Sequence, residues 1–191
     1  IGNSAAFADP IIGGTLEYYG SGGFTQSTDL VVNKLRVDLT SPTSTMTLAA
    51  DLTTNGLFEV SRGTLIISDA SSTNREITSN DRVLVGATGR IRVNTSSGTR
   101  RHKWYFNSDL INNGGELRFT NRTSVVANTY TTSDDDIIEA YFVSSSENQE
   151  FLANGLSNFS RIVVDKGVDM TYILSISSTN PNFFKLLGRC N

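Results

Sequence analysis

The chain carries one short pattern in three copies, Gly63-Thr64-Leu65-Ile66-Ile67-Ser68, Gly89-Arg90-Ile91-Arg92-Val93-Asn94 and Gly115-Glu116-Leu117-Arg118-Phe119-Thr120. The copies begin at positions 63, 89 and 115, so the spacing between successive copies is the same. In each copy the third and fifth residues are apolar and the second is polar, which is the alternation of a β-strand with one buried face. We therefore expect Leu65, Ile91 and Leu117 to share one buried column. Arg92 and Arg118 are expected to lie side by side on the opposite, outer face.

The rest of the chain supports an all-β fold. Short alternating runs such as 35–39, 57–60 and 139–142 are separated by Gly, Asn, Asp and Ser, and no segment holds helical periodicity over three turns. A fixed period of roughly 20–50 residues is typical of stacked repeats. The sequence therefore predicts a right-handed parallel β-helix, a solenoid with coils of about 26 residues, which lies within that range. A β-sandwich, in which short strands also recur, is the alternative.

Composition limits the possible functions. Hydrophobic residues make up 38% of the chain, charged residues only 18%, and the net charge is −3. A nucleic-acid partner is not expected, because the basic excess and basic stripe of such binders are missing. No apolar run approaches the roughly 20 residues of a membrane-spanning helix. A single cysteine cannot form an internal disulfide.

We expect residues 1–191 to form a single β-solenoid segment of a much larger protein. The chain begins without methionine and ends inside the strand-turn pattern at 188–191. The first partner expected for this segment is the rest of that larger protein.

Several strand-turn segments resemble the β-helical regions of very large surface proteins of Bacteroidetes-type bacteria, many of which are exported by the type IX secretion system. The segments that carry the resemblance are 51–56 with 63–65, 102–104, 109–114, 139–142, 154–155, 164–167, 172–174 and 183–188. The resemblance implies a secreted or cell-surface location and a structural or adhesive role, with the secretion or surface-attachment machinery as a partner. A C-terminal sorting module is not found in the chain.

The densest group of carboxylates is a candidate calcium site. Asp134 and Asp136, with Glu139 nearby, supply the oxygen ligands that Ca²⁺ prefers. The spacing matches neither an EF-hand loop nor the glycine-rich nonapeptide of calcium-binding β-rolls. The alternative is a solvated acidic turn, with no cofactor.

The only histidine lies in a basic cluster that is a candidate ligand site. Arg101 and His102 precede Trp104, and an acidic polysaccharide could bind there, with Trp104 or Tyr105 as a stacking platform. One histidine cannot build a two-histidine metal site. The alternative is that Trp104 and Phe106 point inward while the basic residues coat the outside.

No catalytic residue is assigned. Parallel β-helices also host polysaccharide lyases, and Arg92 and Arg118 with Glu59 and Glu116 are charges near one face. Fold analogy alone does not establish an activity, and a ladder of surface charges explains the same pattern. The sequence thus predicts a structural or adhesive segment rather than an enzyme. A lyase-like β-helix and a carbohydrate-binding module remain as alternatives.

Overall fold

The fold is all-β. The computed structural model describes residues 11–67, 73–94, 100–121, 137–167 and 171–190, and no helix occurs among them. It follows that no helix in this part of the chain is long and apolar enough to cross a membrane. The strands are β1 (Ile11–Gly20), β2 (Phe24–Gln26), β3 (Leu30–Leu39), β4 (Thr45–Leu48), β5 (Leu52–Thr54), β6 (Phe58–Ile67), β7 (Glu76–Ser79), β8 (Val83–Val93), β9 (Arg101–Phe106), β10 (Leu110–Asn112), β11 (Glu116–Arg118), β12 (Ile137–Phe142), β13 (Gln149–Ala153), β14 (Leu156–Val164), β15 (Leu174–Ser177) and β16 (Phe184–Cys190).

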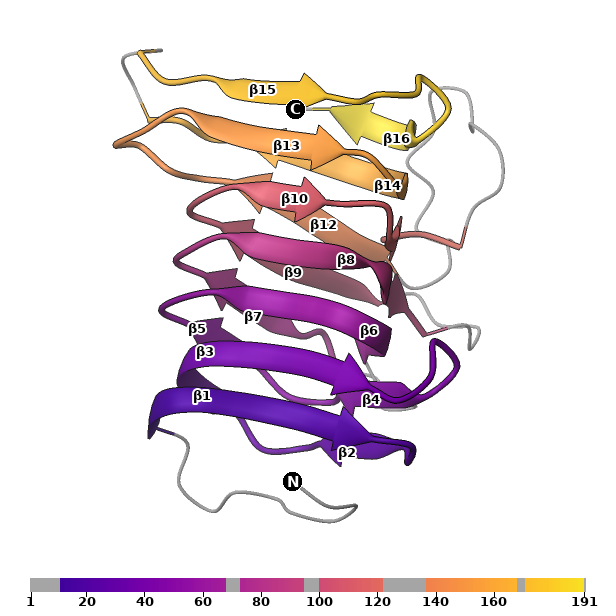
Figure 1. Ribbon diagram of the computed structural model, residues 1–191. Helices are drawn as coiled ribbons and strands as arrows, with labels where there is room; N and C mark the ends of the chain where they lie inside the picture. The colour runs from indigo at the N-terminus through magenta and orange to yellow at the C-terminus, as the bar shows by residue number, and fades with distance from the viewer. Residues whose placement is uncertain (1–10, 68–72, 95–99, 122–136, 168–170, 191) are drawn as a thin grey trace.

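The described strands pair in parallel. Every pairing between two of these strands is parallel. One isolated antiparallel bridge joins Thr120 and Ile137. Figure 1 shows the strands lying one above another, from β1 near the N-terminus to β15 and β16 at the opposite end. The sheets of a β-sandwich are antiparallel, so the sandwich alternative is wrong.

The three copies of the repeat pair in the expected register. Leu65 lies beside Ile91 and Ile91 beside Leu117, and all three side chains are fully buried. Gly63 pairs with Gly89 in the same ladder. The predicted column is confirmed.

The constant spacing holds only for these central copies. Met46 pairs with Leu65, which is a shorter step along the chain than the step from Leu65 to Ile91. Leu117 pairs with Ser157, which is a longer step. Loop length is cheap to vary, because the entropy of closing a loop grows only slowly with its length. The register of the strands is therefore kept while the connections between them differ.

Aromatic side chains fill the interior. Trp104 stacks on Phe106 and Phe119 with ring centroids 5.2 and 5.8 Å away, and Phe58 lies 5.0 Å from it. All four are buried, as predicted for Trp104 and Phe106. Such ring pairs add to the free energy gained by burying their area.

The glycines of the repeat lie where the backbones of neighbouring copies come closest. A Cβ built on Gly115 would lie 2.7 Å from the carbonyl oxygen of Gly89, and one built on Gly155 would lie 2.7 Å from the nitrogen of Gly115. Backbone atoms cannot move aside as a flexible side chain can, so a side chain at these corners would push the strands apart. This close approach explains the glycines that open the second and third copies, whereas Gly63 has a φ of 93° and lies against the side chain of Leu39.

The C-terminal end of the stack is open. Ile176 of β15 continues the inward column that contains Leu110 and Phe151, yet it is 44% exposed whereas those two are 0% exposed. Beside it lies a cavity of about 570 Å³, and the residues that line it are Ile162, Val164, Lys166, Gly167, Tyr172, Ile173, Leu174 and Ile176. Inward-facing apolar residues at this end therefore face solvent.

Candidate functional site

Two of the three predicted ligand-binding residues lie inside the core. On β9, His102 and Trp104 point inward and are fully buried, while Arg101 is only partly buried. His102 accepts a hydrogen bond at Nδ1 from the backbone N–H of Arg75 (2.9 Å), and Trp104 donates one from Nε1 to Ser79 Oγ (3.0 Å). Period-2 alternation places His102 on the same side as Trp104, so the expectation that all the basic residues coat the outside does not hold for it. Neither ring can receive a sugar.

The predicted calcium ligands fall into two groups. Asp134 and Asp136 lie outside the described residues. Glu139 lies on β12, where it is 3% exposed, and its carboxylate accepts hydrogen bonds from Arg161 (3.1 Å) and the Tyr141 hydroxyl (2.8 Å). An arginine partner neutralises this carboxylate locally. No group of three or more potential metal ligands occurs in the described part of the chain, and a calcium site stays a prediction.

Tyr105, the other predicted stacking platform, lies on an outer face. Its ring is half-buried and packs on that of Tyr141 on the next strand, with centroids 5.1 Å apart. Burial, together with the hydrogen bond to Glu139, raises the pKa of Tyr141 to about 12. The two rings pack on each other as an aromatic pair between neighbouring strands.

A buried lysine near the C-terminal end holds polar groups together. Lys166 Nζ donates to the carbonyl oxygen of Glu147 (2.9 Å) and to Gln149 Oε1 (2.7 Å). Gln149 in turn donates to the carbonyl oxygens of Phe106 and Ser108, each at 2.8 Å. Burial lowers the pKa of Lys166, because desolvation disfavours the ammonium. These bonds satisfy three backbone carbonyl groups, which indicates a structural role.

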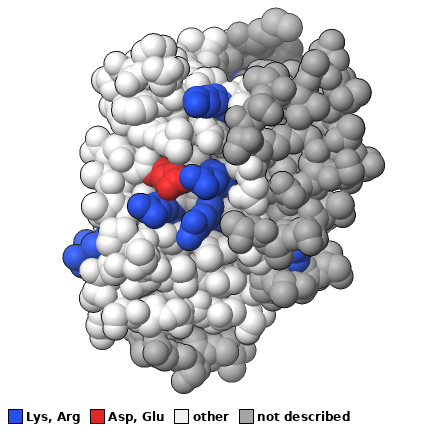
Figure 2. All heavy atoms as spheres, turned by 90° about the vertical axis from the view of Figure 1, so that its right-hand side faces the viewer, with Lys and Arg blue, Asp and Glu red and all other residues white. Residues whose placement is uncertain are grey.

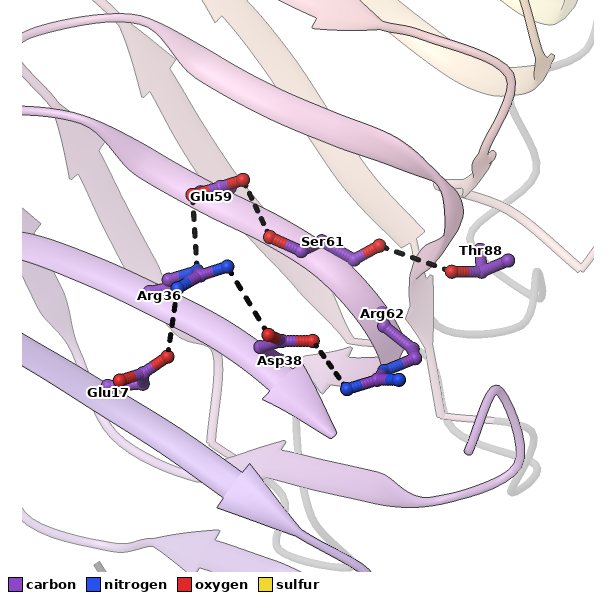
Figure 3. Close-up of polar contacts among 7 residues, drawn as sticks. All are labelled: Glu17, Arg36, Asp38, Glu59, Ser61, Arg62 and Thr88. Carbon is purple, nitrogen blue, oxygen red and sulfur yellow. Dashed lines mark hydrogen bonds and ion pairs between the residues drawn. The ribbon is translucent and has the colours of Figure 1, made fainter. Parts of the chain in front are cut away.

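One outer face carries charges of both signs that pair with each other, and we call it the charge ladder (Glu17, Arg36, Asp38, Glu59 and Arg62). Arg36 lies 3.2 Å from Glu17, 3.3 Å from Asp38 and 3.5 Å from Glu59, and Arg62 lies 3.2 Å from Asp38. Figure 3 shows these ion pairs linking β1, β3 and β6. Both arginines of the ladder have carboxylate partners.

A second outer face carries an excess of positive charge, which we call the arginine face (Arg90, Arg92, Glu116, Arg118, Asn158 and Lys185). Register places Arg92 beside Arg118, Arg118 beside Asn158 and Asn158 beside Lys185. Arg90 lies beside Glu116 in the neighbouring outward column. Figure 2 shows blue side chains gathered around a single red one on this side of the molecule. The predicted neighbourhood of Arg92 and Arg118 is confirmed.

Glu116 is the carboxylate of the arginine face. It lies 2.6 Å from Arg118 Nη2 and 3.6 Å from Arg90 Nε. Glu59, which the sequence also placed near this face, instead pairs with Arg36 in the charge ladder. The glutamate on β6 comes before the Gly63 corner, whereas Glu116 follows Gly115, so the two belong to different faces.

Sequence reasoning missed Arg90. The signal was present, because the second and fourth residues of each copy lie on the side of the strand opposite the buried column, and these are Thr64 with Ile66, Arg90 with Arg92, and Glu116 with Arg118. Thr64 on that side is buried, whereas the other five side chains are partly exposed. Aligning the second residues of the three copies, and not only the fourth, would have placed Arg90 next to Glu116.

Comparison of the chain with models of known families, with curated proteins and with solved structures finds no match. The functional argument therefore rests on the outer faces of the stack and on its open end.

Proposed function

We propose that the chain is a structural and adhesive segment of a large secreted cell-surface protein and that it folds as a right-handed parallel β-helix. The observation that carries the proposal is the set of in-register columns. Parallel pairing links β1, β3, β6, β8, β10, β13 and β15 in that order. A second parallel series links β5, β7, β9, β12 and β14. Each coil of a solenoid buries its apolar face only by stacking on its neighbours, so columns of parallel, in-register strands support this proposal.

The open C-terminal end supports a longer stack. Terminal repeats of soluble solenoids present a polar outer surface, whereas Ile173 and Ile176 are 55% and 44% exposed here. A further coil with an apolar residue above Ile176 would cover this end and fill the cavity beside it. The partner we assign to this end is thus another coil of the same larger protein.

The proposed location and export route rest on the resemblance to β-helical surface proteins of Bacteroidetes-type bacteria. Such a protein would pass through the type IX secretion system and stay attached to the cell or be released from it. The outer faces are lined by ion pairs and polar side chains, which suits a rigid segment surrounded by water.

Surface labelling tests the proposed location. In the producing bacterium, an antibody against this chain should stain intact cells, and protease added outside should remove the signal. Disruption of the type IX machinery should abolish staining while the protein accumulates inside the cell envelope. A periplasmic protein that resists the added protease serves as the control. Staining that needs permeabilised cells in the wild type would contradict the proposal.

A further inference from the structure

The arginine face has too few carboxylates for its cations, whereas the charge ladder has more carboxylates than arginines. In the charge ladder, two arginines share three carboxylates. On the arginine face, Arg90 and Arg118 share the one carboxylate of Glu116, and no ion pair to Arg92 is found in the described part of the chain. Lys185 adds a further exposed cation at the end of the same column. The excess is local, since the whole chain has a net charge of −3.

This arrangement does not help the fold. Arg92 and Arg118 are direct register partners on neighbouring parallel strands, which lie about 4.8 Å apart. Like charges opposite each other on one face of a sheet are destabilising. A neutral polar residue at position 92 would remove this repulsion, so the arginine needs another explanation.

The geometry suits a carboxylate. A guanidinium presents parallel N–H donors that match the two oxygens of a carboxylate, and Glu116 already lies between two of them. Arg90 and Arg118 are each 41% exposed, so part of each guanidinium faces solvent, although Nε of Arg118 is buried. Asn158 lies between Arg118 and Lys185 in the column and adds an amide that can hydrogen-bond a hydroxyl.

We propose that the arginine face binds a polysaccharide that carries carboxylate groups, with Arg92 and Arg118 as its principal contacts. Arg92 and Arg118 lie on neighbouring strands, and Asn158 and Lys185 continue the same column. A column of cationic and polar side chains along the stack suits a linear chain with repeated carboxylates. The inference rests on the adhesive part of the proposed function, for which it names a ligand class.

Binding to polygalacturonate tests the proposal on the purified chain. We expect the wild-type chain to bind polygalacturonate at low salt and to bind it more weakly as salt rises. The double variant Arg92→Gln/Arg118→Gln should bind at least about tenfold more weakly, because it loses two charge-assisted contacts. Arg92→Gln alone should weaken binding while the melting temperature stays the same or rises.

The matched control is Arg82→Gln, which removes the same charge immediately before β8, at the other end of that strand, and should bind as the wild type does. Equal weakening by Arg82→Gln would overturn the proposal, since net charge alone would then explain binding. It would also be overturned by absence of binding, by a fall in melting temperature that accompanies the loss in Arg92→Gln, or by equal binding of dextran sulfate or DNA. The surface-labelling result stands apart from these outcomes, so failure here and failure of the proposed location are distinguishable.

Discussion

Replacement of Ile91 by Asp is expected to unfold the central part of the stack. Ile91 is fully buried between Leu65 and Leu117 in the column of the repeat. A carboxylate there has no partner and interrupts the packing on both sides, so the free energy of unfolding should fall by about 5 kcal/mol or more. The free energy of unfolding of a typical domain is only about 5–15 kcal/mol in total. The fluorescence of Trp104, the only tryptophan and fully buried, reports the loss during denaturant titration.

The matched control for this variant is Ile66→Asp. Ile66 lies on the outer side of β6 and pairs with Arg92. A carboxylate at this position stays in contact with solvent and lies beside a positive charge. We expect a change within about 1 kcal/mol. If Ile91→Asp proves as mild as Ile66→Asp, the assignment of the buried column is contradicted.

Replacement of Trp104 by Ala is expected to have the second-largest effect. The ring contacts Phe58, Phe106 and Phe119 in the aromatic interior. Its removal leaves a cavity and should cost about 3–5 kcal/mol. Thermal unfolding followed by circular dichroism measures the loss, since the variant lacks the fluorescent reporter.

Tyr105→Ala on the same strand is the control for Trp104→Ala. Tyr105 points outward and contacts Tyr141, so its removal should cost only about 1 kcal/mol. A one-residue slip in register would exchange the two faces of the strand. A larger loss for Tyr105→Ala than for Trp104→Ala would therefore show that β9 has the opposite orientation.

The sequence predicted the buried column because strand alternation and a repeated glycine act locally. Leu65, Ile91 and Leu117 follow from period 2 within each copy and from the shared spacing of the copies. The inward position of Trp104 follows from the same rule. His102 also follows from it, since it lies two positions before Trp104, but its polar character suggested the surface. A hydrogen bond from the backbone of Arg75, which only the fold brings close, satisfies Nδ1 of the buried ring.

The sequence did not predict which charges meet across strands. Contacts such as Arg36 with Glu17 and Glu59 depend on pairing between strands whose connections differ in length. The constant spacing of the repeat failed outside the central copies, because register partners there are separated by different numbers of residues, as Leu117 and Ser157 are. Glu59 and Glu116 looked alike in the pattern, and only the corner at Gly63 separates their faces.

Disulfide trapping of register partners tests the parallel stack most directly. With Cys190 replaced by Ser, cysteines introduced at Thr53 and Thr78 should form a disulfide under mild oxidation, because these residues pair on β5 and β7. Neighbouring strands lie about 4.8 Å apart, within the range that a disulfide spans. Cysteines at Thr53 and Glu76 are offset by two residues, about 8 Å apart, and should not cross-link. Mass spectrometry that finds the Thr53–Thr78 pair alone is the result we predict, whereas cross-linking of the offset pair and not of the paired positions would contradict the parallel register.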